Sequence, residues 1–297
     1  MDPETQRTLR LDPRISCEKI SLHIRRLSYA LGAELIGVDL RTPVDDATFI
    51  EIRAAFLNHC VLLFRGVALT REQHVAFSKR FGELYDNNDK ADRFKHAKHP
   101  EILLGSNPRV KGKPTDQYQG EHWHTDRSFT CDPPMASLLR AVEIPDIGGD
   151  TMFANMYLAY DTLSDGMKKL IAGLHSVHVG GSARATGAPP RVAQPLVRIH
   201  PETDRKALYI GAFKKVIPCL VGMTEQESQP LIQFLCDHAT RPRFCYRHQW
   251  RKDDLVIWDN RCLMHNALGD YDRTKVRDME RTTVMGTPSG YVYPPGM

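Results

Sequence analysis

The chain has 297 residues, of which 41% are hydrophobic and 26% are charged, and its formal net charge is +4. This length suffices for one large domain, and no repeat or low-complexity linker divides the chain, so we predict a single domain over residues 1–297. Acidic and basic residues are interspersed, which argues against a nucleic-acid-binding surface. No apolar run reaches the length of a membrane span, so we expect no membrane segment.

The first third of the chain alternates short apolar runs with helix-capping signals. Asp45 or Asp46 can cap a helix, and Thr70 with Gln73 forms a capping box. In chain order we predict an N-terminal arm with a short strand at 1–30, a strand at 32–40, a helix up to His59, a strand at 61–64 and a helix at 70–81.

The rest of the chain reads as many short strands with a few helices, and residues 84–120 read as loops around one strand. Residues 180–195 are rich in Gly and Pro, which predicts a mobile loop over the active site. Strands and helices do not alternate regularly, so we predict a mixed α+β fold whose core is an antiparallel jelly roll with flanking helices. The predicted strands are 101–104, 136–142, 151–154, 196–200, 208–210, 244–250, 255–259 and 281–285, and the predicted helices are 155–160, 164–174 and 224–239.

The 7 cysteines are scattered and form no Cys-x-x-Cys pair. Scattered thiols are typical of a reducing compartment. The polar segment from Met1 to Arg14 lacks the apolar core of a secretory signal. We therefore expect a cytoplasmic protein.

The segment Glu121–Asp126 carries the most informative pattern in the chain. His124 and Asp126 are two residues apart, so on a strand they would share one face. One imidazole and one carboxylate are two thirds of the 2-His-1-carboxylate site used by non-haem Fe(II) oxygenases. His265 is the best candidate for the third ligand, because it follows a predicted strand and a tight turn at 260–262.

Four motifs then occur in a recognisable order. They are Trp123-His124-Thr125-Asp126, Gly148-Gly149-Asp150-Thr151, Trp258-Asp259-Asn260-Arg261 followed by His265, and the pair Arg277 and Arg281. Together they resemble the taurine dioxygenase and dichlorophenoxyacetate dioxygenase family of Fe(II)/2-oxoglutarate-dependent oxygenases. The resemblance spans residues 30–285, and the fold of that family is a double-stranded β-helix, or jelly roll.

The resemblance implies a role for each matching residue. His124, Asp126 and His265 would bind Fe(II). Thr151 and Arg277 would bind 2-oxoglutarate, with the planar guanidinium forming a fork on the distal carboxylate. The segment between His265 and Arg277 is one residue longer than in similar sequences, so Arg273 is an alternative for the co-substrate.

The resemblance also implies the reaction, which is hydroxylation by O₂ with release of succinate and CO₂. Arg281 would hold the anionic group of a small substrate such as a taurine-like sulfonate or an aryloxyalkanoate, and C–S or C–O cleavage could follow. An amino acid or an alkyl sulfate is the alternative substrate. Tyr85 is a candidate for lining the substrate pocket, and His122 a candidate for lying beside the metal or the substrate.

Other readings of the motif are weaker. A cupin-like metalloprotein using His122 and His124 needs a Glu four residues after the second His, where this chain has Ser128. A zinc hydrolase tolerates the same ligands but does not need an anchor for 2-oxoglutarate. The sequence is compatible with a homo-oligomer and does not specify one.

Overall fold

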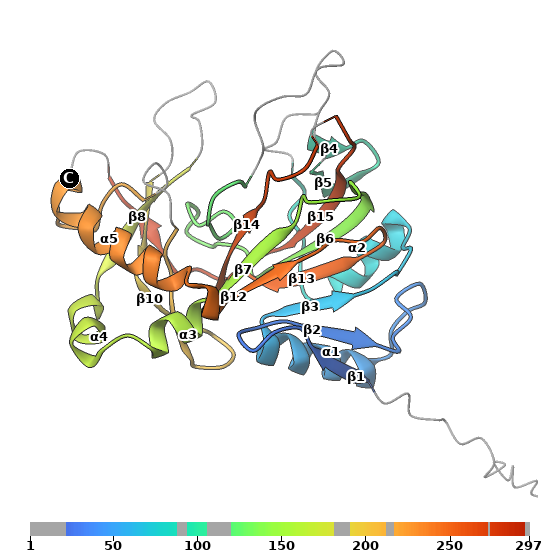
Figure 1. Ribbon diagram of the computed structural model, residues 1–297, viewed down its shortest axis with the longest axis horizontal. Helices are drawn as coiled ribbons and strands as arrows, with labels where there is room; N and C mark the ends of the chain where they lie inside the picture. The colour runs from blue at the N-terminus through green and yellow to red at the C-terminus, as the bar shows by residue number, and fades with distance from the viewer. Residues whose placement is uncertain are drawn as a thin grey trace, which may run out of the picture.

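The computed structural model describes residues 22–87, 94–105, 120–180, 191–211, 217–272 and 274–294. Its largest element is an eight-stranded sheet with the order β1-β2-β3-β13-β6-β15-β5-β4 (Figure 1). The β2–β3 pairing is parallel and the other pairings in this sheet are antiparallel. Its strands are β1 (His23–Arg26), β2 (Ala33–Ile36), β3 (Val61–Phe64), β4 (Lys95–His96), β5 (His99–Leu104), β6 (Ala136–Glu143), β13 (Leu255–Asp259) and β15 (Asp278–Val284).

Three smaller antiparallel sheets accompany the large one. The order β12-β7-β14 is formed by β12 (Cys245–His248), β7 (Thr151–Asn155) and β14 (Leu263–Ala267). The order β16-β9-β8 is formed by β16 (Tyr291–Val292), β9 (Arg191–Pro195) and β8 (His175–Val179). The third sheet pairs β10 (Val197–Ile199) with β11 (Lys206–Leu208).

The helices begin where the sequence places capping residues. Helix α1 (Asp46–His59) is capped by Asp45, and helices α2 (Arg71–Lys79) and α5 (Glu225–Ala239) each begin with a complete capping box. Each cap satisfies backbone N–H groups that the first turn would leave without partners. Two short helices, α3 (Met156–Asp161) and α4 (Asp165–Ile171), and the 3₁₀ helix η2 (Pro242–Phe244) complete the set of named helices in the described residues.

Strand β13 lies at the centre of the large sheet and all five of its residues are buried. Leu255 and Ile257 pack into one hydrophobic cluster with residues of α1 and α2. Val256 and Trp258 pack into a second cluster with residues of α3, α5 and β7. Because side chains alternate along a strand, β13 contributes to a core on each face of the sheet.

The structure confirms most predicted elements and corrects two of them. Residues 191–195 are strand β9, paired with β8, so the mobile loop predicted at 180–195 is wrong in that part. Residues 181–190 lie outside the described residues. Residues 121–126 are not a strand, and β4, β8, β14 and β16 were not predicted. The single domain over 1–297 stays a prediction. Within the described ranges, no helix has both the length and the apolar character needed to cross a bilayer.

Candidate metal centre

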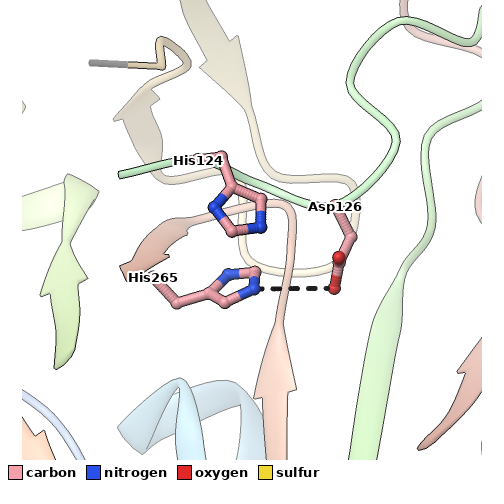
Figure 2. Close-up of side chains that lie close together, drawn as sticks. All are labelled: His124, Asp126 and His265. Carbon is pink, nitrogen blue, oxygen red and sulfur yellow. Dashed lines mark ion pairs between the residues drawn. The ribbon is translucent and has the colours of Figure 1, made fainter. Parts of the chain in front are cut away.

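Three side chains from two distant segments converge on one point. His124 and His265 form an isolated β-bridge, in which each backbone N–H donates to the carbonyl of the other at 3.0 and 2.8 Å. Asp126 follows two residues later, at the start of a turn over residues 126–129, and its side chain lies towards the same point, as Figure 2 shows. The potential ligand atoms of His124, Asp126 and His265 all lie within 4.8 Å of one another. His124 and Asp126 therefore face the same point, as predicted, although residues 121–126 form no regular strand.

The two imidazoles are in the state that a metal requires. The Nδ1–H of His124 donates to the carbonyl oxygen of His122 at 2.7 Å, which leaves the lone pair on Nε2 available. The Nε2 of His265 lies 3.9 Å from Oδ2 of Asp126. Burial lowers the pKa of both His124 and His265, so both rings are neutral at pH 7.

Asp126 supplies the negative charge of the group. Burial alone would raise its pKa, but the charge of Arg281 and the hydrogen bond from Ser137 outweigh burial and hold the pKa well below its usual range. Oδ1 accepts from Nη1 of Arg281 at 2.6 Å, and Oδ2 accepts from the hydroxyl of Ser137 at 2.7 Å. Two neutral imidazoles and a carboxylate fit a divalent metal such as Fe(II), and the group is too small to fill its coordination sphere.

A buried chain of hydrogen bonds fixes the orientation of the Asp126 carboxylate. The indole N–H of Trp258 donates to Oδ1 of Asn260 at 2.9 Å, and Nδ2 of Asn260 donates to the hydroxyl of Ser137 at 3.0 Å. Ser137 and Asn260 are both fully buried. The hydroxyl of Ser137 therefore has one possible direction for its proton, which is towards Asp126.

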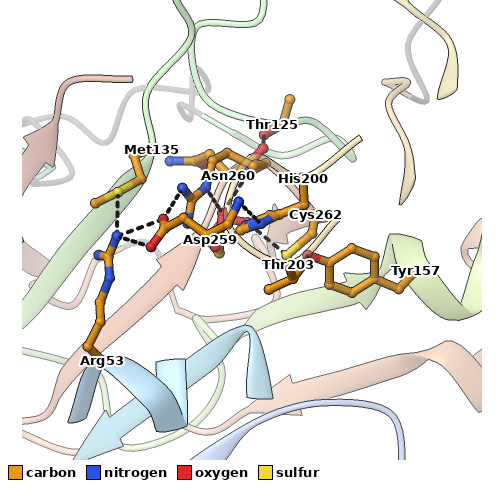
Figure 3. Close-up of polar contacts among 11 residues, drawn as sticks. Arg53, Thr125, Met135, Tyr157, His200, Thr203, Asp259, Asn260 and Cys262 are labelled. Carbon is orange, nitrogen blue, oxygen red and sulfur yellow. Dashed lines mark hydrogen bonds and ion pairs between the residues drawn. The ribbon is translucent and has the colours of Figure 1, made fainter. Parts of the chain in front are cut away.

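The turn after β13 is held by a second buried network (Figure 3). Asp259 accepts from Nε and Nη2 of Arg261 at 2.8 and 2.7 Å, and from His200 at 3.0 Å. Arg261 and Arg53 both bind Glu202. His200, Asp259 and Cys262 also lie close enough to hold an ion. Both oxygens of Asp259 are taken by a guanidinium, however, so this group stabilises the turn and is not a metal site.

The predicted 2-oxoglutarate residues meet at the turn before β7. Gly149 has a φ of 71°, and a Cβ there would lie 3.2 Å from Nε of Arg277, so only glycine allows this approach. Nε of Arg277 donates to the carbonyl oxygen of Gly149 at 3.1 Å. Two residues on, the buried hydroxyl of Thr151 accepts from the indole N–H of Trp250 at 3.0 Å. This bond leaves the proton of Thr151 available for another acceptor.

The remaining predicted residues lie around this centre. Arg281 binds Asp126 directly, which the sequence did not predict. The ring of His122 lies 4.9 Å from that of His124. The hydroxyl of Tyr85 donates to the carbonyl oxygen of Asp132 at 3.0 Å, and the guanidinium of Arg127 lies over its ring. The substrate-binding roles of these three residues stay predictions, and Arg273 lies outside the described residues.

No sequence motif indicated a role for Ser137 or Trp250. Ser137 lies on β6, opposite Trp258 of β13 in the sheet register, and Trp250 follows β12. Ser137 acts through Asp126, which is 11 residues away in the chain, and Trp250 acts through Thr151, which is 99 residues away. Asn260 was part of a recognised motif, but its hydrogen bonds to Ser137 and Trp258 could be found only from the structure.

Comparison with known proteins identifies the family. A profile of the "Taurine catabolism dioxygenase TauD, TfdA family" matches residues 23–283. The chain belongs to this family. It is 36% identical to the α-ketoglutarate-dependent 2,4-dichlorophenoxyacetate dioxygenase of Burkholderia sp. (strain RASC), over 90% of this chain and 95% of that protein.

Solved structures agree with this assignment. A taurine dioxygenase from Burkholderia xenovorans is 37% identical, with a TM-score of 0.78 over 93% of this chain and 96% of that one. The structure of AAD-2 in complex with Mn(II) and N-oxalylglycine is 33% identical, with a TM-score of 0.78 over 91% of this chain and 98% of that one. The comparisons confirm the predicted class of enzyme, a dioxygenase dependent on 2-oxoglutarate, which is α-ketoglutarate.

Proposed function

We propose that this dioxygenase uses Fe(II), 2-oxoglutarate and O₂ to hydroxylate a small organic acid, releasing succinate and CO₂. The observation that carries the proposal is the convergence of His124, Asp126 and His265, whose ligand atoms lie within 4.8 Å of one another. Bound Fe(II) supplies the activation of O₂ there, while the protein sets the geometry and excludes water. Family membership supports a jelly-roll core around this centre, which we propose as the finer description of the fold.

The protein holds the metal with ligands that are already in their binding states. The hydrogen bond to the carbonyl oxygen of His122 directs Nε2 of His124 inward. Each oxygen of Asp126 already accepts one hydrogen bond, from Arg281 or from Ser137. Three protein donors would hold Fe(II) and would leave further coordination positions for the co-substrate and O₂.

Arg277 and Thr151 bind the distal carboxylate of 2-oxoglutarate in this proposal. The bond from Nε of Arg277 to Gly149 fixes the guanidinium plane and directs its terminal nitrogens. Thr151, positioned by Trp250, donates its hydroxyl proton to the same carboxylate. Burial lowers the pKa of Arg277, but a guanidinium remains charged at pH 7, so the fork keeps its charge.

The substrate proposed is an aryloxyalkanoate or a taurine-like sulfonate. The relatives' names support this choice, since one acts on 2,4-dichlorophenoxyacetate and another is a taurine dioxygenase. When the hydroxylated carbon carries oxygen or sulfur, the product can collapse with cleavage of the C–O or C–S bond. An amino acid or an alkyl sulfate is the alternative within the same chemistry.

The test is succinate formation by the purified protein with Fe(II), ascorbate and 2-oxoglutarate. The panel contains phenoxyacetates, taurine and other sulfonates, alkyl sulfates and amino acids. We expect substrate-dependent succinate with at least one organic acid, and none from His265→Ala. Succinate that does not depend on Fe(II), or hydrolysis supported by zinc alone, would refute the proposal.

A further inference from the structure

One buried glutamine connects the segment that carries Asp126 to two other parts of the chain. Gln194 lies on β9, and its side chain is fully buried. Its amide nitrogen, Nε2, donates to the carbonyl oxygens of Ser128 and Thr130 at 3.1 and 2.7 Å. These two residues belong to the turn that begins at Asp126, which we call the ligand turn (residues 126–130). Both N–H groups of the amide are therefore used by carbonyl groups of the ligand turn.

The C-terminal segment (residues 286–294) holds the other end of this amide. The hydroxyl of Ser289 donates to Oε1 of Gln194 at 2.9 Å, so the amide oxygen faces Ser289 and the nitrogen faces the ligand turn. The backbone N–H groups of Ser289 and Gly290 donate to the carbonyl oxygen of Cys131 at 2.9 and 3.1 Å. A Cβ on Gly290 would lie 2.6 Å from Nε2 of Gln194, which is closer than any side chain could approach. The C-terminal segment therefore packs directly against the amide.

The ligand turn contains a backbone conformation that needs support from its surroundings. Arg127 directly follows the metal ligand Asp126 and has a φ of 47°, in the left-handed region that residues other than glycine seldom adopt. Such a conformation is costly and persists where neighbouring contacts hold it in place. Within the turn, the N–H of Thr130 donates to the carbonyl oxygen of Arg127 at 2.9 Å. The two bonds from Gln194 add a connection to a different part of the fold.

Strand β9 gives Gln194 a firm base. It is the middle strand of the sheet β16-β9-β8, so its backbone is paired on both sides. Gln194 lies opposite Ser176 of β8, and its neighbour Ala193 lies opposite Tyr291 of β16. A side chain on a paired strand holds its contacts more precisely than one on a loop. The amide can therefore transmit the position of this sheet to the ligand turn.

We propose that Gln194 is a positioning residue for the metal centre. It clamps the ligand turn against β9 and the C-terminal segment, and so fixes the backbone from which Asp126 projects. Arg281 and Ser137 act on the carboxylate itself, whereas Gln194 acts through the backbone of the turn. This inference rests on the proposed function, because it requires a metal at Asp126, and it assigns a role to a residue outside the sequence motifs.

The experiment compares wild type with Gln194→Met, using Gln229→Met as the matched control. Methionine has nearly the length of glutamine but no N–H group to donate. The amide of Gln229 on α5 also donates to two carbonyl oxygens, those of Ile217 and Pro218 at 3.2 and 2.7 Å, in a segment without metal ligands. Each protein is assayed for backbone amide hydrogen exchange of the apoprotein, for Mn(II) affinity by titration and for Tm by calorimetry.

In Gln194→Met, amide exchange in residues 126–131 should be at least about tenfold faster, because two hydrogen bonds that hold the turn are lost. Mn(II) affinity should fall about three- to tenfold, less than on loss of a group bonded directly to a ligand. Gln229→Met should keep the Mn(II) affinity of wild type, even though its Tm also falls. Gln194→His keeps one N–H donor and should recover part of the affinity.

The outcomes separate this inference from the proposed function. If wild type binds Mn(II) and Gln194→Met binds it equally well, Gln194 has no positioning role, while the proposed function stands. If wild type binds no Mn(II), the proposed function is wrong and the positioning role fails with it. Ser289→Ala removes only the donor to Oε1 of Gln194 and should give a smaller loss of Mn(II) affinity, which keeps the test valid if Gln194→Met does not fold.

Discussion

Ser137→Ala tests whether the hydrogen bond behind Asp126 organises the metal centre. Ser137 is fully buried, and its hydroxyl donates to Oδ2 of Asp126 at 2.7 Å while it accepts from Asn260 at 3.0 Å. A hydrogen bond to a charged group contributes about 1.5–3 kcal/mol. For a chain of this length, a loss of about 2 kcal/mol lowers Tm by roughly 3 °C. Loss of a group that orients a metal ligand typically weakens metal binding about 10–100-fold.

Mn(II) titration of the apoprotein measures this affinity without turnover, and differential scanning calorimetry measures Tm. The matched control is Ser78→Ala. Ser78 is equally buried, and its hydroxyl bonds to the carbonyl oxygen of His74 at 2.7 Å and to Thr282 at 2.6 Å, away from the ligands. Both variants should lose stability, and only Ser137→Ala should lose Mn(II) affinity. Equal Mn(II) affinity in both variants would refute the role assigned to Ser137.

Three further predictions follow from the contacts. Arg277→Ala should raise the KM for 2-oxoglutarate at least about tenfold, because the paired hydrogen bonds from the guanidinium to the carboxylate are lost. The Mn(II) affinity should not change. Loss of metal binding with normal co-substrate binding would contradict the role proposed for Arg277. Trp250→Phe removes the hydrogen-bond donor to Thr151 and should raise the KM for 2-oxoglutarate a fewfold, which corresponds to about 1 kcal/mol of binding free energy. An unchanged KM would mean that Trp250 only packs against its neighbours. Burial, with the nearby Arg140 charge, lowers the pKa of His74 from 6.5 to about 3. The unfolded chain therefore binds the proton more tightly, and stability falls as pH drops below 6.5. Between pH 7 and pH 5, the His74→Gln variant should lose about 2 kcal/mol less of its unfolding free energy than wild type, as measured by urea titration. If both proteins show the same pH dependence, His74 is not the cause of the loss of stability.

Local signals predicted local structure well. The capping box at Thr70 predicted the start of α2, because a cap depends only on residues within one turn. The segment Leu255–Asp259, in which only Asp259 is not apolar, predicted the central strand β13 with the same bounds. The cap involves residues close together in the chain, and the strand is recognisable from its run of apolar residues.

Elements defined by distant partners were harder to predict. Polar and apolar residues do not alternate along β14, so its sequence did not predict a strand. The strand is defined by its pairing with β7, in which His265 lies opposite Phe153. The segment 121–126 has the spacing of a strand, yet after the bridge at His124 it turns. The convergence of His124, Asp126 and His265 was nevertheless predicted, because these residue types, within motifs that resemble those of a family, carry chemical information that does not depend on the local backbone.

The reciprocal backbone bonds between His124 and His265 have a consequence for metal exchange. They join two segments far apart in the chain through backbone atoms that take no part in metal binding, so the entropy cost of closing that long loop belongs to folding and not to metal capture. The apoenzyme should therefore stay folded, and one divalent ion can replace another without refolding. Which ion is loaded then depends more on cellular availability than on the shape of the site.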